Sequence, residues 1–301
     1  MNHHNPGTLG PRVSAYAVIG ISAAVVLFTF GCATAPPVEE APEPVTSAVP
    51  TTQPEAEPEP VFRTVYLPTR ERVYRADGTL DSYREFHYED DGLGLTKELR
   101  YSGTGELVQT RVYQLQDGRP VKEHHYDSPE RLQSMRRYQH DAEGNLIEEE
   151  VFDAADELLS RSSYTYDEQG RRTSWRVFTG FAGFMGTTVY RFDNGNLIRI
   201  ESLNPRDELE EYFVNEFDAR GRPTRRTHYE AADRRLAHID YEYEGNHLQV
   251  ETHYRSSGAV QRSVQYEYDG AGNVVIEYHR DGSGNLRERI EREFTSREIQ
   301  E

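Results

Sequence analysis

The sequence predicts an all-β protein, a long antiparallel β-meander of about seventeen strands in a curled or coiled sheet with no helical domain. Three observations predict it. The chain has 20 tyrosines and 12 phenylalanines but only three methionines, a composition typical of strands. From residue 61 onward, short segments alternate in polarity with period two, as half-buried strands do. A turn motif, Asp-x-x-Gly-x-Leu, recurs between these segments every 12 to 15 residues.

The turn motif has a simple physical basis. Clear copies run over residues 141–146, 269–274 and 281–286. The aspartate opens a turn by accepting hydrogen bonds from its own backbone, and the glycine adopts the left-handed conformation that strains other residues. Loops of this kind join antiparallel strands. Because strand follows turn without an intervening helical segment, we expect consecutive strands to be neighbours in the sheet.

Several of the turns follow a pair of aromatic residues. The segments beginning Tyr164-Thr-Tyr166-Asp167, Tyr266-Glu-Tyr268-Asp269 and Tyr190-Arg-Phe192-Asp193 resemble YD repeats, the units of the RHS family. The resemblance covers most of residues 61–295 and implies β-hairpins that wind into a large spiralling sheet. We expect neither the family's C-terminal core nor its toxin domain here, and about seventeen strands are too few for a closed cocoon.

The N-terminus is typical of a bacterial lipoprotein. Residues 1–31 comprise a polar start with Arg12, an uncharged stretch over 13–30 and Gly31, which together predict a cleaved signal peptide. Gly31-Cys32 resembles a lipobox, although Thr29 stands where that family usually has leucine. Cys32 is the only cysteine, and the resemblance implies that it carries the lipid. The alternative is an uncleaved transmembrane anchor.

Residues 32–60 predict a disordered linker, and residues 61–301 the β-repeat domain with a short charged C-terminal tail. The linker is rich in proline and glutamate and has no aromatic residue, so it cannot bury enough surface to fold. We expect a lipid anchor to hold the protein in the bacterial cell envelope, at the periplasmic or surface face of the outer membrane. A membrane β-barrel is the less favoured alternative, because both faces of most strands carry charge.

Charge and motifs narrow the partners. A net charge of −18 argues against nucleic acid. Three apolar residues at one expected loop tip, Phe181, Phe184 and Met185, are the candidate partner-binding site, although the rings could instead cap the end of the sheet. His238 and His253 are the one pair of histidines that cross-strand register could bring together. We predict no metal and no cofactor.

The sequence contains no catalytic motif, so we expect no enzyme activity. The favoured function is a scaffold or binding surface for an envelope protein or a glycan, because repeats form surfaces more readily than pockets. An assembly factor that binds client chains by strand addition is an alternative. A glycan hydrolase using paired carboxylates is a weaker one.

Overall fold

The structure is a computed structural model that describes residues 61–300 except 91, 128–129 and 181. These residues belong to one unit, Pro58–Glu301, and form strands joined by short turns. The strands are β1 (Phe62–Arg75), β2 (Leu80–Tyr88), β3 (Leu95–Ser102), β4 (Leu107–Gln116), β5 (Arg119–Asp127), β6 (Arg131–His140), β7 (Leu146–Asp153), β8 (Leu158–Tyr166), β9 (Arg172–Thr179), β10 (Gly183–Asp193), β11 (Asn196–Leu203), β12 (Leu209–Phe217), β13 (Pro223–Glu230), β14 (Arg235–Glu244), β15 (His247–Arg255), β16 (Val260–Tyr268), β17 (Val274–Asp281) and β18 (Leu286–Gln300).

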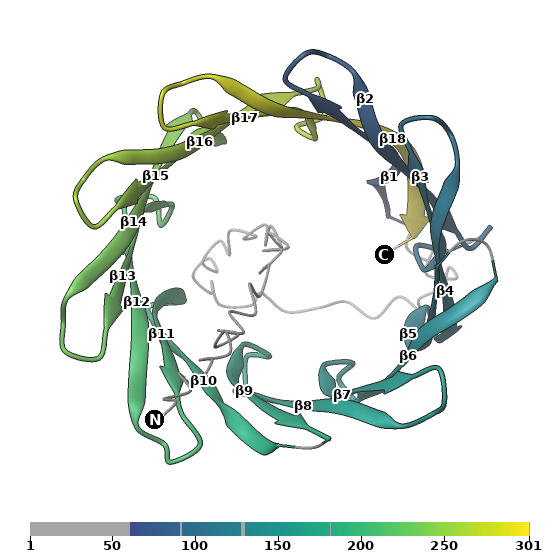
Figure 1. Cartoon of the computed structure of the whole chain (residues 1–301), viewed down its shortest axis with the longest axis horizontal. Helices are drawn as coiled ribbons and strands as arrows, with labels where there is room; N and C mark the ends of the chain where they lie inside the picture. Colours follow the sequence, from purple (N-terminus) through teal and green to yellow (C-terminus); the bar gives the residue numbers. More distant parts are fainter. Residues whose placement is uncertain (1–60, 91, 128–129, 181, 301) are drawn as a thin grey trace, which may run out of the picture. The chain divides into compact units, whose positions relative to one another are not determined.

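The all-β meander is confirmed, but the expectation of an open, curled sheet is wrong. Each strand pairs antiparallel with the next, and β1 also pairs with β18 from Phe62↔Gln300 to Arg75↔Glu288. The 18-stranded sheet therefore closes into a barrel (Figure 1). Closure gives both terminal strands a partner, which protects edges that would otherwise pair with other chains. β18 continues past Phe294 to Gln300, through the segment expected to be a charged tail.

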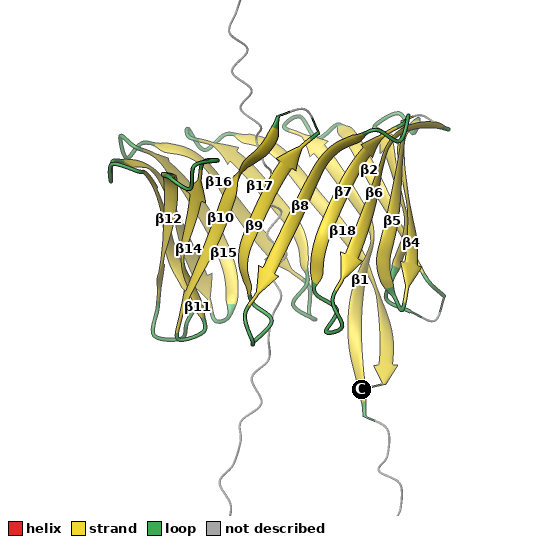
Figure 2. Cartoon of the chain, turned by 90° about the horizontal axis from the view of Figure 1, so that it is seen from below, coloured by secondary structure: helices red, strands yellow, loops and turns green. Residues whose placement is uncertain are grey.

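Residue chirality identifies the side chains that line the lumen. Arg75 donates its N–H to the Thr79 oxygen, so the peptide groups of Glu71, four residues earlier, also point toward β2. When an L-residue in a rising strand points its side chain at the viewer, its peptide groups point right. Seen from outside, the rising strand β9 has β10 on its left (Figure 2). Glu71, whose peptide groups point toward the next strand, therefore points into the lumen.

The repeat is two strands long, not one. Following the cross-strand register from Glu71 gives one lumen-facing position on each odd-numbered strand, and these positions are 25 to 27 residues apart: Glu71, Glu98, Glu123, Glu149, Trp175, Ile200, Arg226, Glu251 and Glu277. A β-bulge follows each turn, where the register shifts by one residue. Bulges increase local twist and bend the strand, which favours closure of the sheet.

The barrel is wide enough to leave a passage. Eighteen strands about 4.8 Å apart and tilted by roughly 40° enclose a ring on the order of 35 Å across between opposite backbones. Side chains extend only about 6 Å from each wall, on that same estimate of scale. The lumen wall is therefore the largest concave surface of this unit, and its side chains decide what it can bind.

Candidate functional site in the barrel lumen

The predicted site residues are only partly placed. Cys32 and Phe181 lie outside the described residues. Phe184 starts β10 on the outer wall, where its ring packs on Phe178 with 5.2 Å between centroids, and the Arg176 guanidinium lies 4.7 Å from its centroid. Met185 is 48% exposed. The packing of Phe184 fits the capping alternative, and partner binding at this tip stays a prediction.

The two histidines expected to meet do not. His238 pairs with Tyr254 on the outer wall, where the two rings stack 4.4 Å apart, whereas His253 pairs with Ile239 and faces the lumen. No group of three histidine, cysteine, aspartate or glutamate side chains is arranged to hold a metal ion within the part of the chain that is described.

Half of the lumen wall carries a continuous run of alternating glutamate and arginine, which we call the charge ladder. It crosses the junction of the two terminal strands. The Arg292 guanidinium bonds to Glu71 at 2.9 Å and to Glu277 at 2.5 Å. From Glu71 it continues through contacts of each arginine with two glutamates. The ladder comprises Glu277, Arg292, Glu71, Arg84, Glu98, Arg111, Glu123, Arg136 and Glu149, on strands β17, β18 and β1 to β7.

The ladder glutamates are buried, and arginines compensate their charge. The exposed fractions of the Glu71, Glu98 and Glu123 side chains are 7%, 11% and 8%. Burial acts to raise the pKa of Glu277, but a hydrogen bond from His279 and the charge of Arg292 outweigh it, so the pKa is lowered. Each carboxylate thus stays ionised and partnered, which does not favour the raised-pKa acid that a glycan hydrolase needs.

The other half of the lumen wall, strands β8 to β16, is mainly apolar at the same positions. Its members include Ile200, Phe213, Ile239 and Val264, the last only 3% exposed. Phe213 stacks on His228 with 4.3 Å between ring centroids. Two charged residues interrupt this half, namely Arg226, whose Nε donates to Asn215 at 2.8 Å, and Glu251. The complete set is Ser162, Trp175, Thr188, Ile200, Phe213, Arg226, Ile239, Glu251 and Val264.

A group of aromatic residues lies where the charge ladder ends. We call it the aromatic cluster: Tyr164 and Tyr166 on β8, Arg172 and Trp175 on β9, and Tyr190 on β10. Tyr164 pairs with Trp175, and the Arg172 guanidinium lies 4.5 Å from the centroid of the Tyr164 ring. Trp175 Nε1 and Arg172 Nε are buried without a hydrogen-bond partner among the described residues. Both are donors that need an acceptor.

Tyr164 joins the cluster to the ladder. Its hydroxyl donates to Glu149 at 3.0 Å, the last ladder carboxylate. Burial, with the charge of Glu149, raises the pKa of Tyr164 to about 12, so the phenol stays protonated at neutral pH. The Tyr166 hydroxyl donates to the Leu146 carbonyl oxygen at 2.7 Å. Both rings are thereby fixed in position on the wall.

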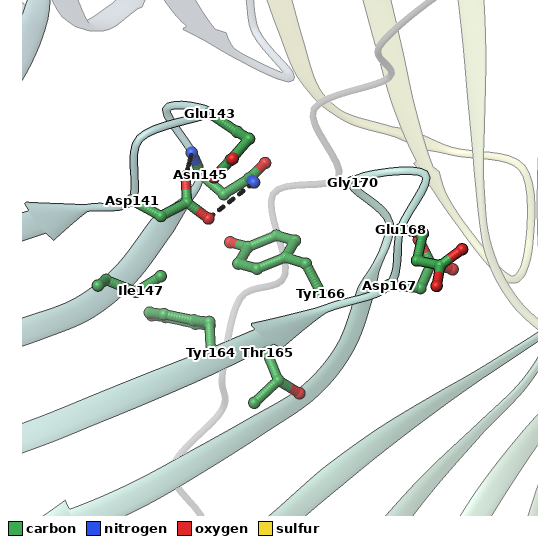
Figure 3. A pocket seen from close by; sticks show the side chains of 10 residues that line it. All are labelled: Asp141, Glu143, Asn145, Ile147, Tyr164, Thr165, Tyr166, Asp167, Glu168 and Gly170. Carbon is green, nitrogen blue, oxygen red and sulfur yellow. Dashed lines mark hydrogen bonds between the residues drawn. The ribbon is translucent and has the colours of Figure 1, made fainter.

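A depression of about 560 Å³ adjoins the cluster at the rim where the turns after the even-numbered strands lie. Tyr164 and Tyr166 form its floor beside Ile147, and two turns, 141–145 and 167–170, flank it (Figure 3). Asp141 is held by its turn, accepting from the Asn145 backbone N–H at 2.7 Å. The depression therefore combines aromatic faces with carboxylates, which are also supplied by Glu143, Asp167 and Glu168.

The outer wall is polar rather than apolar. It carries ion pairs such as Arg225–Asp240 at 2.6 Å and Arg72–Glu293 at 2.6 Å, interleaved with stacked tyrosines such as Tyr212 and Tyr229. A charged side chain facing lipid costs about 2–4 kcal/mol near the bilayer midplane. The outer wall is therefore unsuited to contact with hydrocarbon. Among the described residues, no helix is long and apolar enough to cross a membrane.

Sequence reasoning missed the ladder and the cluster, although a signal for both was present. Glutamates recur at residues 71, 98, 123 and 149, and a tyrosine recurs 14 or 15 residues after the last three of the four at positions 113, 138 and 164. The turn motif marks every strand end and so obscures this longer period. Only the register shows that these positions share one face.

No protein-family model matches the chain, and no curated protein matches it. Among solved structures, a porin-like protein from Bacteroides uniformis is similar, with 11% identity, a TM-score of 0.40, and coverage of 76% of this chain and 96% of that one. A porin-like protein from Bacteroides vulgatus has 12% identity and a TM-score of 0.30, with coverage of 76% and 98%. The Photorhabdus luminescens Tc holotoxin pore has 14% identity and a TM-score of 0.27. Its alignment covers 75% of this chain, which spans 15% of the toxin chain. Similarities this weak support no inference about function.

Proposed function

We propose that this chain is a non-enzymatic lipoprotein of the cell envelope that binds a protein or a glycan along the lumen wall of its barrel. The wall supports this proposal, because it is broad and concave and differs in chemistry between its two halves. Tyrosine, tryptophan and arginine are the residues that most often anchor binding partners. In the aromatic cluster they lie together beside a depression.

The fold disfavours the strand-addition alternative. A client chain that adds a strand needs unpaired N–H and C=O groups along an edge. Every described strand has a neighbour on both sides, including β1 and β18. The RHS resemblance and the lipid anchor at Cys32 stay predictions. An envelope location, with the outer membrane as the expected membrane, is part of the same proposal.

Crosslinking in intact cells tests the lumen directly. A photoreactive phenylalanine analogue would replace Tyr190 in the lumen, Tyr254 on the outer wall or Phe184 at the tip, in three separate variants. We expect a covalent partner, protein or glycan, from the Tyr190 position. Crosslinks from Tyr254 or Phe184 alone would place the binding surface outside the lumen and contradict the proposal. Cys32→Ser, with loss of membrane association and of incorporated lipid, tests the anchor separately.

A further inference from the structure

We infer that the aromatic cluster and the adjoining depression form a subsite for one pyranose ring of a neutral glycan chain. The inference rests on the proposed function and names the ligand class for it. Three features carry it: a pair of aromatic faces, two donors without acceptors, and carboxylates around the depression. Each matches a different part of a sugar ring.

The aromatic faces match the C–H surface of a pyranose. Tyr164 and Trp175 are register partners on neighbouring strands, and Tyr190 follows on the next strand. Directly opposed side chains in a sheet are about 5 Å apart at Cβ, so the rings form a continuous platform. Aromatic side chains combine a large apolar face with little conformational freedom to lose on binding.

The donors match sugar oxygens. Trp175 Nε1 and Arg172 Nε lack acceptors among the described residues, and a buried donor without a partner destabilises the free protein. Arg172 differs here from its neighbour Arg171, which is held by Asp167 at 2.7 Å. A hydroxyl or ring oxygen seated on the platform would supply the missing acceptors.

The carboxylates match sugar hydroxyl protons and select against anionic sugars. Glu143 and Glu168 line the depression and are exposed, while Asp141 and Asp167 are held by their turns. Ionised carboxylates accept hydrogen bonds from hydroxyls and repel a uronate. A neutral glycan satisfies the donors and the acceptors together, whereas an acidic one would satisfy only the donors.

Fluorescence gives a direct test, because Trp175 is the only tryptophan in the chain. The intact protein would be titrated with maltohexaose, cellohexaose and the hexamer of N-acetylglucosamine, with hexagalacturonate as the anionic probe. We expect a saturable change in Trp175 emission with at least one neutral hexamer and a weaker response to hexagalacturonate. No response to any neutral hexamer, or a response to hexagalacturonate alone, overturns the inference.

Two substitutions locate the binding. Tyr164→Ala removes half of the platform and should weaken binding about tenfold, while Tyr164→Phe keeps the ring and should bind normally. Tyr241→Ala is the matched control, because Tyr241 is lumen-facing at the equivalent position on β14 but has Glu251 rather than a tryptophan as its register partner. Equal losses in Tyr164→Ala and Tyr241→Ala, with both barrels folded by circular dichroism, overturn the subsite. A partner crosslinked at Tyr190 without any glycan response would retain the proposed function and reject only this ligand class.

Discussion

The two halves of the lumen wall share one backbone and differ in what fills it. From β17 through β1 to β7, the ring position alternates glutamate and arginine; from β8 to β16, it is occupied mainly by tryptophan, isoleucine, phenylalanine and valine. The turns and bulges continue around both halves without a change in repeat length. The hairpin unit therefore sets the barrel, and the lumen positions are left to vary in chemistry.

The halves are stabilised in different ways. In the charge ladder each arginine lies between two glutamates, so removing one member leaves buried partners uncompensated. In the apolar half each side chain contributes the area it buries, largely independently of the next. Substitutions at equivalent positions should therefore differ in size, in salt dependence and in how strongly they couple to their neighbours.

Acid should produce the largest effect, and it should act on the charged groups. Arg131 lowers the pKa of Asp127 to about 2, and the Arg222 backbone N–H and its guanidinium lower the pKa of Asp218. A carboxylate whose pKa is lower in the folded state adds stability above its unfolded pKa of about 4 and loses it as the pH falls through the folded value. We expect the melting temperature to fall steeply between about pH 4 and pH 2.

Trp175 makes the acid experiment a comparison between halves. Its emission reports on the apolar half, while far-ultraviolet circular dichroism reports on the whole barrel. If the charged half opens first, the dichroism signal should change at higher pH than the fluorescence. A melting temperature that is the same at pH 5 and pH 3 would contradict the stabilising role assigned to these carboxylates.

Glu71→Ala should be the most destabilising single substitution in the ladder. It leaves Arg84 and Arg292 facing each other at the strand that closes the barrel. Breaking a fully buried pair costs about 3–5 kcal/mol. Because Arg84 is 40% exposed, we expect about 2–3 kcal/mol in the free energy of unfolding, measured by urea denaturation. Glu216→Ala on the exposed outer wall is the control and should change stability by less than about 0.5 kcal/mol. Equal effects would show that the ladder has no special role.

Val264→Ala tests the apolar half at a position that is only 3% exposed. Truncating a buried valine removes two methyl groups, and we expect a loss of about 1–2 kcal/mol. The loss should be nearly the same in low and high salt, whereas that of Glu71→Ala should depend on salt. A strong salt dependence for Val264→Ala would mean that the two halves are energetically coupled.

The sequence predicted the local features of this barrel and missed those that depend on register. The turns at Asp167 and Asp269 were predictable, because each aspartate is held by backbone N–H groups within four residues. Closure was not, because Glu71 and Arg292 are 221 residues apart and meet only if twist and curvature accumulate correctly over every intervening strand. For the same reason, the alternation that identified each strand could not show which of its two faces is the lumen.

Arg111→Met should have the smallest effect, and its size decides how the ladder works. The Arg111 guanidinium lies 3.9 Å from Glu98 and 3.7 Å from Glu123, longer contacts than those of Arg292, and the side chain is 40% exposed. Methionine keeps much of the aliphatic stem, so we expect a loss below about 1 kcal/mol in urea denaturation. The double variant Glu71→Ala with Arg111→Met should then show additive losses, because the two sites share no partner. A loss from Arg111→Met as large as that from Glu71→Ala, or a strongly non-additive double variant, would show instead that the ladder acts as one cooperative network from β17 to β7.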